Sequence, residues 1–254
     1  YESLDDDGTT YYYRGNVTNN YVKFAGINWR VVRINGDGSV RLLYNGDNSS
    51  LSIGKSMYST IRDNPTYVGY MYSNTLNTSY VDTIRNDNDS TVKTTLDDWY
   101  KTNIMDKGYS NKVADSGFCN DRSLYAGSPG NGVVTNNTSI YASYARFLGY
   151  SPSYVCPNAD NDLFTLTGNT KGNGALTYPI GLLTLDVLVY AGVVNGYVNK
   201  MVFTYSSNPY WTMTPLYYAS DYSSAFMFNT LEGGTVGYST VASNYGVRPV
   251  INLK

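Results

Sequence analysis

The chain has 254 residues, with 20 acidic and 18 basic side chains and a formal net charge of −2. No cluster of Lys or Arg exceeds two or three within a short window, so the sequence lacks a basic stripe that could follow phosphates or an anionic membrane. This argues against nucleic acid as a partner. The length suits one large domain or two small ones, and because no linker divides the chain, we expect a single domain over residues 1–254.

Neutral polar residues take the place of charge. Charged residues make up 15% of the chain, well under the roughly 25% of an average domain, whereas Tyr and Asn each occur 28 times. Tyr gives a stiff contact area with a hydroxyl at its tip, and Asn gives a donor and an acceptor. The mixture is typical of antibody loops and favours a binding surface. A compositional drift in a low-charge surface protein is the alternative.

The first residues resemble neither an export signal nor a membrane span. No stretch of 18 apolar residues occurs in the chain, and the acidic start at 1–8 has no basic or apolar segment. We expect residues 1–10 to be a linker from an N-terminal anchor outside this sequence. The protein is then secreted or displayed on a bacterial cell surface, and it meets a membrane only through that anchor.

Cys119 and Cys156 are the only cysteines. They form an even pair without metal-type spacing. A disulfide between them is favoured over two free buried thiols, and its loop would contribute roughly 3–4 kcal/mol in the chain-entropy description.

The first fifty residues predict a meander of short strands. Strand-type runs occur at residues 11–14, 21–24, 28–34 and 39–44, parted by turn residues. The sharpest local signal is Asn35–Gly38, because Asn-Gly and Asp-Gly tolerate the positive φ that a tight hairpin needs.

The segment over residues 45–90 predicts a long decorated loop with short local elements, because it is polar and weakly periodic. A helix follows, capped by Asp89 or Ser90 and stopped by Gly108. Its apolar stripe is expected to pack on a sheet.

Residues 108–192 predict loops with short elements. A second helix is expected over 139–148 and a strand over 163–167. Thr184 is the expected N-cap of a short apolar helix that ends at Ala191 and Gly192.

The last fifty residues return to strands. The candidates are residues 210–214, 225–228, 235–238 and 247–253, with a hairpin turn at 233–234. Strands at both ends with helices and long loops between them predict an α+β fold.

Histidine is absent from the whole chain. Its absence removes Ser-His and Cys-His nucleophile pairs, imidazole bases and His-containing zinc sites. We therefore expect that the protein is not an enzyme.

Paired carboxylates are the remaining route to catalysis, because glycoside hydrolysis uses two of them. Asp97 and Asp98 are adjacent on the expected helix and point in different directions, which favours surface groups. The other candidates are Asp160, Asp162, Asp186 and Glu232.

Calcium is the one cofactor that the sequence suggests. Asn158, Asp160 and Asp162 place side-chain oxygens at alternating positions, and residues 5–7 and 86–89 do the same. None of these runs has the full twelve-residue calcium loop with its closing Glu, and such clusters are usually turns.

Arg248 lies in an otherwise apolar terminal run, where a buried guanidinium needs a partner. A structural role is favoured, in which Arg248 pairs with a carboxylate or with backbone carbonyls and fixes the C-terminal strand. Contact with a ligand is the alternative.

The tryptophans are expected in the core, Trp29 and Trp99 among them. Trp211 has an alternative role, since it lies beside Tyr210, Tyr217 and Tyr218 and could line an aromatic groove for sugars.

Four strings carry a resemblance to a known family: Trp29–Gly38, Leu182–Asp186, Trp211–Pro215 and Gly246–Leu253. Together they resemble bacterial surface domains with a C-type-lectin-like fold, related in architecture to the formylglycine-generating-enzyme branch. The resemblance implies a small twisted antiparallel sheet that joins both termini, two flanking helices and long loops that display a binding site.

The resemblance does not carry over the chemistry of the catalytic and calcium-binding relatives. In the catalytic relatives a cysteine pair and a metal act together, but Cys119 and Cys156 lie far from the C-terminal region. The calcium triplets of the sugar-binding branch, Glu-Pro-Asn, Gln-Pro-Asp and Trp-Asn-Asp, do not occur here.

Some members of this fold are varied by diversity-generating retroelements ahead of a terminal Gly-Phe/Val-Arg-Pro. The resemblance implies that Tyr, Ser, Asn and Asp positions near the C-terminus are the variable ones. Those that fit are Tyr217, Tyr218, Ser220, Asp221, Tyr222, Ser223, Asn229, Tyr238, Ser239 and Asn244.

The expected function is a non-catalytic adhesin or receptor module, on a bacterial surface or pilus-like fibre, that binds a protein or glycan on another cell or host surface. A structural pilin-like or envelope subunit is the alternative, and a glycan-processing enzyme is third. The expected ligand contacts are the ten positions just named together with Tyr210 and Trp211.

Overall fold

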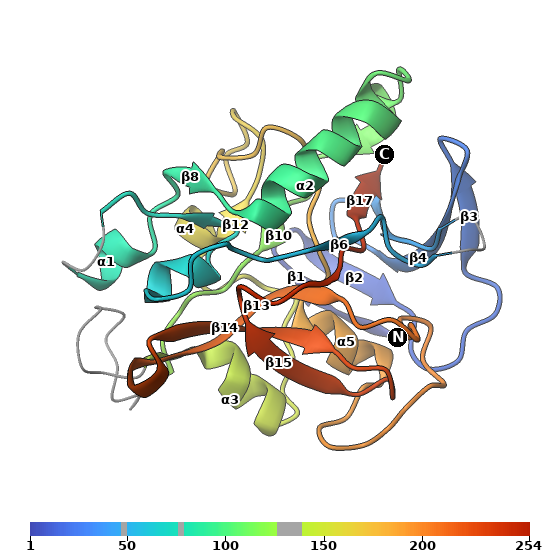
Figure 1. The fold of residues 1–254 in the computed structure, drawn as a ribbon. Coiled ribbons are helices and arrows are strands. Elements are labelled where there is room, and N and C mark those ends of the chain that lie inside the picture. The colour runs from blue at the N-terminus through green and yellow to red at the C-terminus, as the bar shows by residue number, and fades with distance from the viewer. Residues whose placement is uncertain (47–49, 76–78, 126–138) are drawn as a thin grey trace.

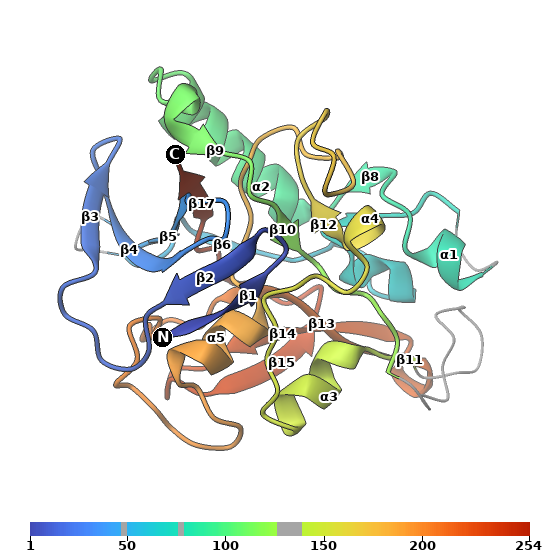
Figure 2. The same ribbon diagram turned by 180° about the vertical axis from the view of Figure 1, so that it is seen from behind.

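The structure is a computed structural model that describes residues 1–46, 50–75, 79–125 and 139–254. It is an α+β fold in which the strand pairs are antiparallel, apart from isolated bridges. Two sheets and their helices enclose a shared core (Figures 1 and 2). No helix in the described ranges has the length and apolar character needed to cross a membrane.

A seven-stranded sheet contains both the first and the last strand of the chain. Its order is β1-β2-β4-β5-β17-β9, and β3 also pairs with β4. The C-terminal strand therefore lies between β5 and β9 rather than at an edge. The bounds are β1 Glu2–Asp5, β2 Gly8–Tyr12, β3 Tyr21–Phe24, β4 Ile27–Ile34, β5 Val40–Tyr44, β9 Val113–Ala114 and β17 Val250–Leu253.

The sequence predicts that the first ten residues are a linker, but they are part of the fold. They form the β1–β2 hairpin, which joins the sheet where Tyr12 pairs with Arg33 of β4. The acidic run is the turn of this hairpin, since the Asp5 carboxylate accepts the Asp7 N–H at 2.9 Å. The ring of Tyr12 packs against Tyr190 with centroids 4.8 Å apart.

The predicted hairpin at Asn35–Gly38 is confirmed between β4 and β5. Gly38 has φ 84, a conformation that glycine adopts without strain. Gly36 is needed for another reason: a Cβ there would lie 2.5 Å from the backbone N of Gly8. The turn and the β1–β2 hairpin therefore touch.

A four-stranded sheet forms the C-terminal part of the fold. Its order is β11-β13-β14-β15, with the predicted glycine turn at 233–234 between the last two strands. The register of β13 against β14 shifts on both sides of Pro215. The bounds are β11 Ser139–Ile140, β13 Trp211–Ala219, β14 Ser224–Thr230 and β15 Val236–Thr240.

Three helices of seven or more residues start and stop near the predicted signals. The first is α2 (Thr91–Tyr100), whose N-cap Ser90 accepts the N–H of Lys93. It continues into a wider turn over Lys101–Met105. The other two are α3 (Ala142–Leu148) and α5 (Leu185–Ala191), which has Thr184 as N-cap and Gly192 with φ 111 after its end.

The predicted long loop at 45–90 is more ordered than its composition indicates. Tyr58 and Tyr70 in this segment are fully buried, so it adds to the core. Its described short elements are β6 (Lys55–Ser56), η1 (Pro65–Val68), β7 (Met71–Tyr72), α1 (Tyr80–Thr83) and β8 (Asn88–Asp89). β6 pairs with β16 (Tyr245–Gly246).

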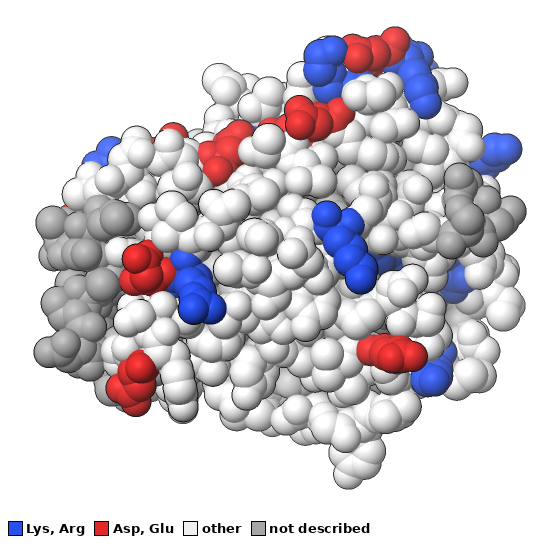
Figure 3. Space-filling view, viewed as in Figure 1, with Lys and Arg blue, Asp and Glu red and all other residues white. Residues whose placement is uncertain are grey.

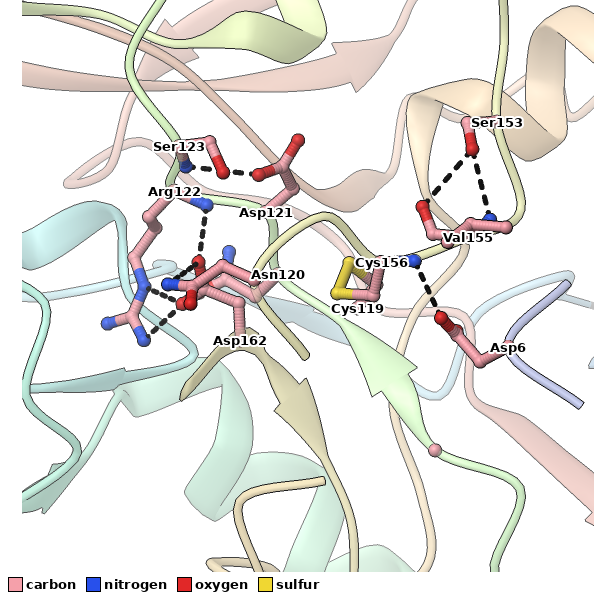
Figure 4. The surroundings of a disulfide bond; sticks show 12 residues. Asp6, Cys119, Asn120, Asp121, Arg122, Ser123, Ser153, Val155, Cys156 and Asp162 are labelled. Carbon is pink, nitrogen blue, oxygen red and sulfur yellow. Dashed lines mark hydrogen bonds and ion pairs between the residues drawn. A yellow bond between two sulfur atoms is a disulfide. The ribbon is translucent and has the colours of Figure 1, made fainter. Parts of the chain in front are cut away.

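The disulfide between Cys119 and Cys156 is present, as predicted, with the two Cα atoms 5.7 Å apart (Figure 4). Cys119 ends β10 (Phe118–Cys119), which pairs with β12 (Leu163–Phe164). The N–H of Cys156 donates to Asp6 at 2.9 Å. The disulfide thus joins two segments in the middle of the chain, and the hydrogen bond to Asp6 links one of them to the N-terminal hairpin.

Candidate functional site

The tip between β13 and β14 holds a run of residues expected to bind. A short turn over Ser220–Tyr222 connects the strands, and Ser223 follows it with φ 45. Asp221, Tyr222 and Ser223 are exposed, and Tyr222 is 76% exposed. The Asp221 and Tyr222 side chains can change without disturbing the core, whereas the Ser223 side chain contacts the phenol of Tyr218.

Four of the expected ligand contacts are buried instead. Trp211 donates its indole N–H to the Ser56 carbonyl at 2.9 Å, and the Tyr218 hydroxyl donates to the Asp63 carbonyl at 3.1 Å. The prediction is therefore wrong for these positions, which belong to the framework of the sheet. The four are Tyr210, Trp211, Tyr218 and Asn229, each no more than 2% exposed.

The alternation of β13 explains why neighbouring tyrosines have different surroundings. Successive side chains of a strand point to opposite faces, so Tyr218 faces the core and Tyr217 the other side. The irregular pairing around Pro215 sets which one is buried. A proline that interrupts a strand is usual at such bulges.

Three aromatic rings gather on the face to which Tyr217 points. Tyr217 lies 4.7 Å from Phe226 and 5.9 Å from Tyr238, and Phe226 lies 6.2 Å from Tyr238, all between ring centroids. Tyr217 and Phe226 are half-buried, while Tyr238 is 56% exposed. We name these three residues the aromatic cluster.

Two further tyrosines lie close to the aromatic cluster. Burial raises the pKa of Tyr217, and the nearby phenols of Tyr238, Tyr222 and Tyr144 raise it further. The sequence prediction missed Tyr144 and Phe226. Both lie outside the polar loop positions, and only the pairing of β14 with β13 and β15 brings Phe226 to the same patch.

Helix α3 covers only part of this face (Figure 2). Phe228 points the same way as Phe226, two residues earlier in β14, and it contacts Phe147 of α3 with centroids 5.7 Å apart. The rings of the aromatic cluster extend beyond this contact. An aromatic patch that emerges from under a helix is typical of a contact surface rather than of a closed core.

Charge is sparse around the C-terminal sheet. The sequence from Trp211 to Gly246 has only two charged residues, Asp221 and Glu232. On the side of the molecule shown in Figure 3, charged groups gather mainly over the C-terminal end of α2. A ligand held here would be recognised by apolar contact and neutral hydrogen bonds.

Ser239 and Asn244 have different surroundings. The Ser239 hydroxyl accepts from the Asn229 amide at 2.9 Å and donates to the Tyr245 hydroxyl at 2.8 Å. It therefore belongs to an internal network. Asn244 is exposed in the turn after β15.

The calcium candidates do not form a ligand set. The Asp162 carboxylate is fully buried and pairs with Arg122 (Figure 4), and Asn158 donates its amide to the same carboxylate at 3.3 Å. Asp160 is exposed. Among the described residues, no three His, Cys, Asp or Glu side chains are grouped to hold a metal.

Asp97 and Asp186, two of the carboxylates considered for catalysis, have structural partners. Asp97 contacts the buried Lys93 at 2.7 Å, and burial raises its pKa. Asp186 and Asp121 share Arg146, at 3.0 and 2.7 Å. Burial alone would lower the pKa of Arg146, but the two carboxylates outweigh it and hold that pKa above its ordinary value.

A polar cavity of about 30 Å³ lies beside the disulfide, lined by Asp6, Arg33 and Arg41 among others. Burial, together with the nearby Arg33, lowers the pKa of Arg41 to about 9. The cavity has room for a water molecule or two.

The two residues expected to be structural are so. Trp29 is fully buried and donates its indole N–H to the Phe24 carbonyl at 3.2 Å. Arg248 is 1% exposed and donates to the carbonyls of Thr204 at 2.8 Å and Tyr44 at 3.0 Å. The predicted pairing of Arg248 with backbone carbonyls is confirmed.

Comparison with known proteins gives no further guide, since no family model, curated protein or solved structure matches this chain.

Proposed function

We propose that this chain is a non-catalytic binding module with a C-type-lectin-like fold, displayed on the outside of a bacterial cell. It holds a protein or glycan ligand on the aromatic cluster of Tyr217, Phe226 and Tyr238, with Tyr222 at the adjoining tip. The observation that carries the proposal is the contact of these three part-exposed rings on strands that have no charged residue.

Several features support a binder over an enzyme. The chain has no histidine, and Asp97 and Asp186 are engaged by Lys93 and Arg146. The disulfide is typical of proteins that fold in oxidising surroundings. Part-exposed aromatic side chains with a polar tip are the residues that most often supply binding energy.

The test is a pair of matched double variants. Tyr217→Ser with Tyr238→Ser removes two rings of the cluster, while Tyr11→Ser with Tyr13→Ser removes two exposed tyrosines of the N-terminal hairpin. Labelled proteins are applied to a printed glycan array and to immobilised mucin and extracellular-matrix proteins. The binding signal should be roughly tenfold or more lower for the cluster variant than for the parent chain, and it should be unchanged for the hairpin variant. Equal signals in both would place the binding site elsewhere.

The exposed tip also suits diversification of the kind that the family resemblance implies. Ser220, Asp221, Tyr222 and Ser223 form the connection between two strands and not the framework. Substitution of the exposed Asp221 and Tyr222 costs little stability. We propose the four tip positions, with Tyr217, Tyr238 and Asn244, as the variable set. The buried positions form the fixed frame. A neighbouring template repeat with a reverse transcriptase gene would support this, and a genome lacking both would refute it.

A second candidate, assembly between copies, is favoured by a different patch. Tyr11, Tyr13 and Ile34 are 53%, 37% and 45% exposed and line a groove of about 420 Å³ at the N-terminal hairpin. Light scattering over a concentration series separates the two functions, since a monomer at high concentration refutes assembly through this groove.

A further inference from the structure

Strand β15 is an edge strand. Within the described ranges it pairs with β14 alone, and Figure 1 shows no strand along its other side. An edge strand presents backbone donors and acceptors that a further strand can use.

The register identifies which backbone groups face outward. The N–H of Val241 donates to the Ala225 carbonyl at 3.0 Å and the N–H of Leu231 to the Thr235 carbonyl at 2.9 Å. Hydrogen-bonded and non-bonded pairs alternate along an antiparallel ladder. The residues between these two ends that face away from β14 are therefore Val236, Tyr238 and Thr240.

Most of these outward groups are open. The Thr240 carbonyl accepts the Ser243 N–H at 2.9 Å. For the N–H and carbonyl groups of Val236 and Tyr238, the described part of the chain supplies no partner. Val236 and Tyr238 thus each offer a backbone donor and a backbone acceptor. Their spacing of two residues matches the spacing at which an added strand presents its own donors and acceptors.

The edge lacks the devices that usually prevent pairing. Natural proteins block edges with charged side chains or proline, but β15 reads Val-Gly-Tyr-Ser-Thr and has neither. Large apolar side chains lie over both of its faces. Tyr238 belongs to the aromatic cluster, and Leu231, 37% exposed, lies 2.7 Å from the position that a Cβ of Gly237 would take.

We propose that an extended segment of a partner polypeptide adds to β15 as a fifth strand of this sheet and sets an apolar side chain against Phe226 and Tyr238. The inference rests on the proposed function and narrows its ligand to a protein.

Ring geometry favours a polypeptide over a glycan. A pyranose stacks on a flat aromatic surface, but the ring planes of the cluster are inclined by 31° between Tyr217 and Phe226, 63° between Tyr217 and Tyr238 and 76° between Phe226 and Tyr238. Inclined rings instead enclose a side chain. The outward amides beside them then bind the backbone of the same segment.

The short edge disfavours a second copy of the chain as the occupant. Five residues span about 17 Å, and two such edges placed side by side bury less than the roughly 1,200 Å² at which stable interfaces begin. A separate extended segment has no such need, because weak strand addition at one edge suffices for a peptide ligand.

The experiment pans a phage-displayed library of random linear peptides on the parent chain. The enriched peptides are then measured against Val236→Pro and Val236→Ala. Proline removes the outward N–H without touching the pairing with β14, and alanine keeps that N–H while it also shortens the side chain. We expect affinity to fall tenfold or more with Val236→Pro and to stay within about threefold of the parent with Val236→Ala. Hydrogen exchange on the parent chain should show protection of the Val236 and Tyr238 amides only when peptide is bound.

Each other result overturns the inference. Peptides that bind Val236→Pro as well as Val236→Ala, or that leave both amides unprotected, do not pair with β15. A library without any binder refutes strand addition, and array signals that depend on the cluster would still uphold the proposed function. A parent chain that dimerises, with loss of the dimer in Val236→Pro, would make a second copy the occupant.

Discussion

Arg122 and Asp162 form a buried ion pair, with Nη2 and Oδ1 2.7 Å apart and both side chains almost without solvent exposure. The Arg122 backbone N–H also donates to Asp162, at 2.9 Å. The guanidinium reaches the Met71 carbonyl at 3.1 Å and the Asn86 side chain at 2.9 Å. The Arg122–Asp162 pair thus connects the 45–90 segment, which contains Met71 and Asn86, to the chain just after β10 and just before β12, near the disulfide (Figure 4).

The first prediction concerns this pair. Asp162→Ala should lower the free energy of unfolding by about 3–5 kcal/mol, because it leaves a buried guanidinium without its counter-charge. The matched control is Asp106→Ala, which breaks the exposed pair with Lys101 at 2.9 Å and should cost at most about 1 kcal/mol. Urea unfolding measures both. Equal losses would contradict the difference in burial.

The second prediction concerns the disulfide. Cys119→Ser with Cys156→Ser should lower the free energy of unfolding by roughly 3–4 kcal/mol, because the bond closes a loop of 37 residues in the unfolded chain. Urea unfolding of the oxidised parent and of the variant gives the difference. As a control, reductant should shift the parent toward the variant and leave the variant unchanged. A parent that gains mass on alkylation without reductant would show free thiols and refute the bond.

The third prediction concerns Arg248. Arg248→Lys should cost about 2 kcal/mol, because a single ammonium cannot serve the Tyr44 and Thr204 carbonyls as the planar guanidinium does, and a buried unpaired acceptor costs about 1–3 kcal/mol. Thermal and urea unfolding check this value. A variant as stable as the parent would mean that one hydrogen bond is enough there.

The fourth prediction concerns alkaline pH. Burial raises the pKa of Tyr58, Tyr70, Tyr141 and Tyr154 above the ordinary value, which is about 10. In the unfolded chain these phenols lose their protons near pH 10, so their contribution to stability is complete below that pH and is lost as the pH rises above it. The arginines whose pKa burial lowers act in the opposite sense; they are Arg30, Arg33, Arg248 and Arg41, whose pKa falls to about 9. Further tyrosines with a raised pKa, Tyr80, Tyr100 and Tyr210 among them, act in the same sense as the first four. The melting temperature should therefore fall steadily above pH 10.

Tyr58→Phe is the matched variant for the alkaline effect. The Tyr58 hydroxyl has no hydrogen-bond partner among the described residues, so its removal should leave stability at neutral pH unchanged or raise it by about 1 kcal/mol. Above pH 10 the free energy of unfolding should fall less steeply with pH, because one fewer phenol loses its proton on unfolding. A parent that stays equally stable from neutral pH to well above pH 10 would contradict both expectations.

Local signals in the sequence predicted the elements that depend on a few neighbouring residues. Ser90 and Thr184 cap helices because their hydroxyls accept backbone N–H groups three residues ahead. Gly38 turns a hairpin because it adopts positive φ. The disulfide was favoured because only two cysteines are present. The contacts that form the two caps and the turn lie within the segments themselves, and each cysteine has only one other cysteine with which to pair.

Features that depend on distant pairing were missed. In the sequence the acidic residues of the hairpin at 1–12 resemble a linker. The contact that holds this hairpin on the fold, between Tyr12 and Tyr190 of α5, joins residues that are distant in the sequence. The exposure of Tyr217 and the burial of Tyr218 follow from the bulges around Pro215, which alternation in the sequence does not show. Phe226 joins the candidate site only through its neighbours on β13 and β15, so no pattern within 224–230 marks it.

The central position of β17 constrains the order of events during synthesis. It pairs with β5, more than two hundred positions earlier in the chain, and with β9. Until it emerges from the ribosome, β5 has an open side and the seven-stranded sheet exists as two separate parts. The seven-stranded sheet therefore stays unfinished until all the residues between β5 and β17 have been made, and chaperones or premature pairing would have their greatest effect at that stage.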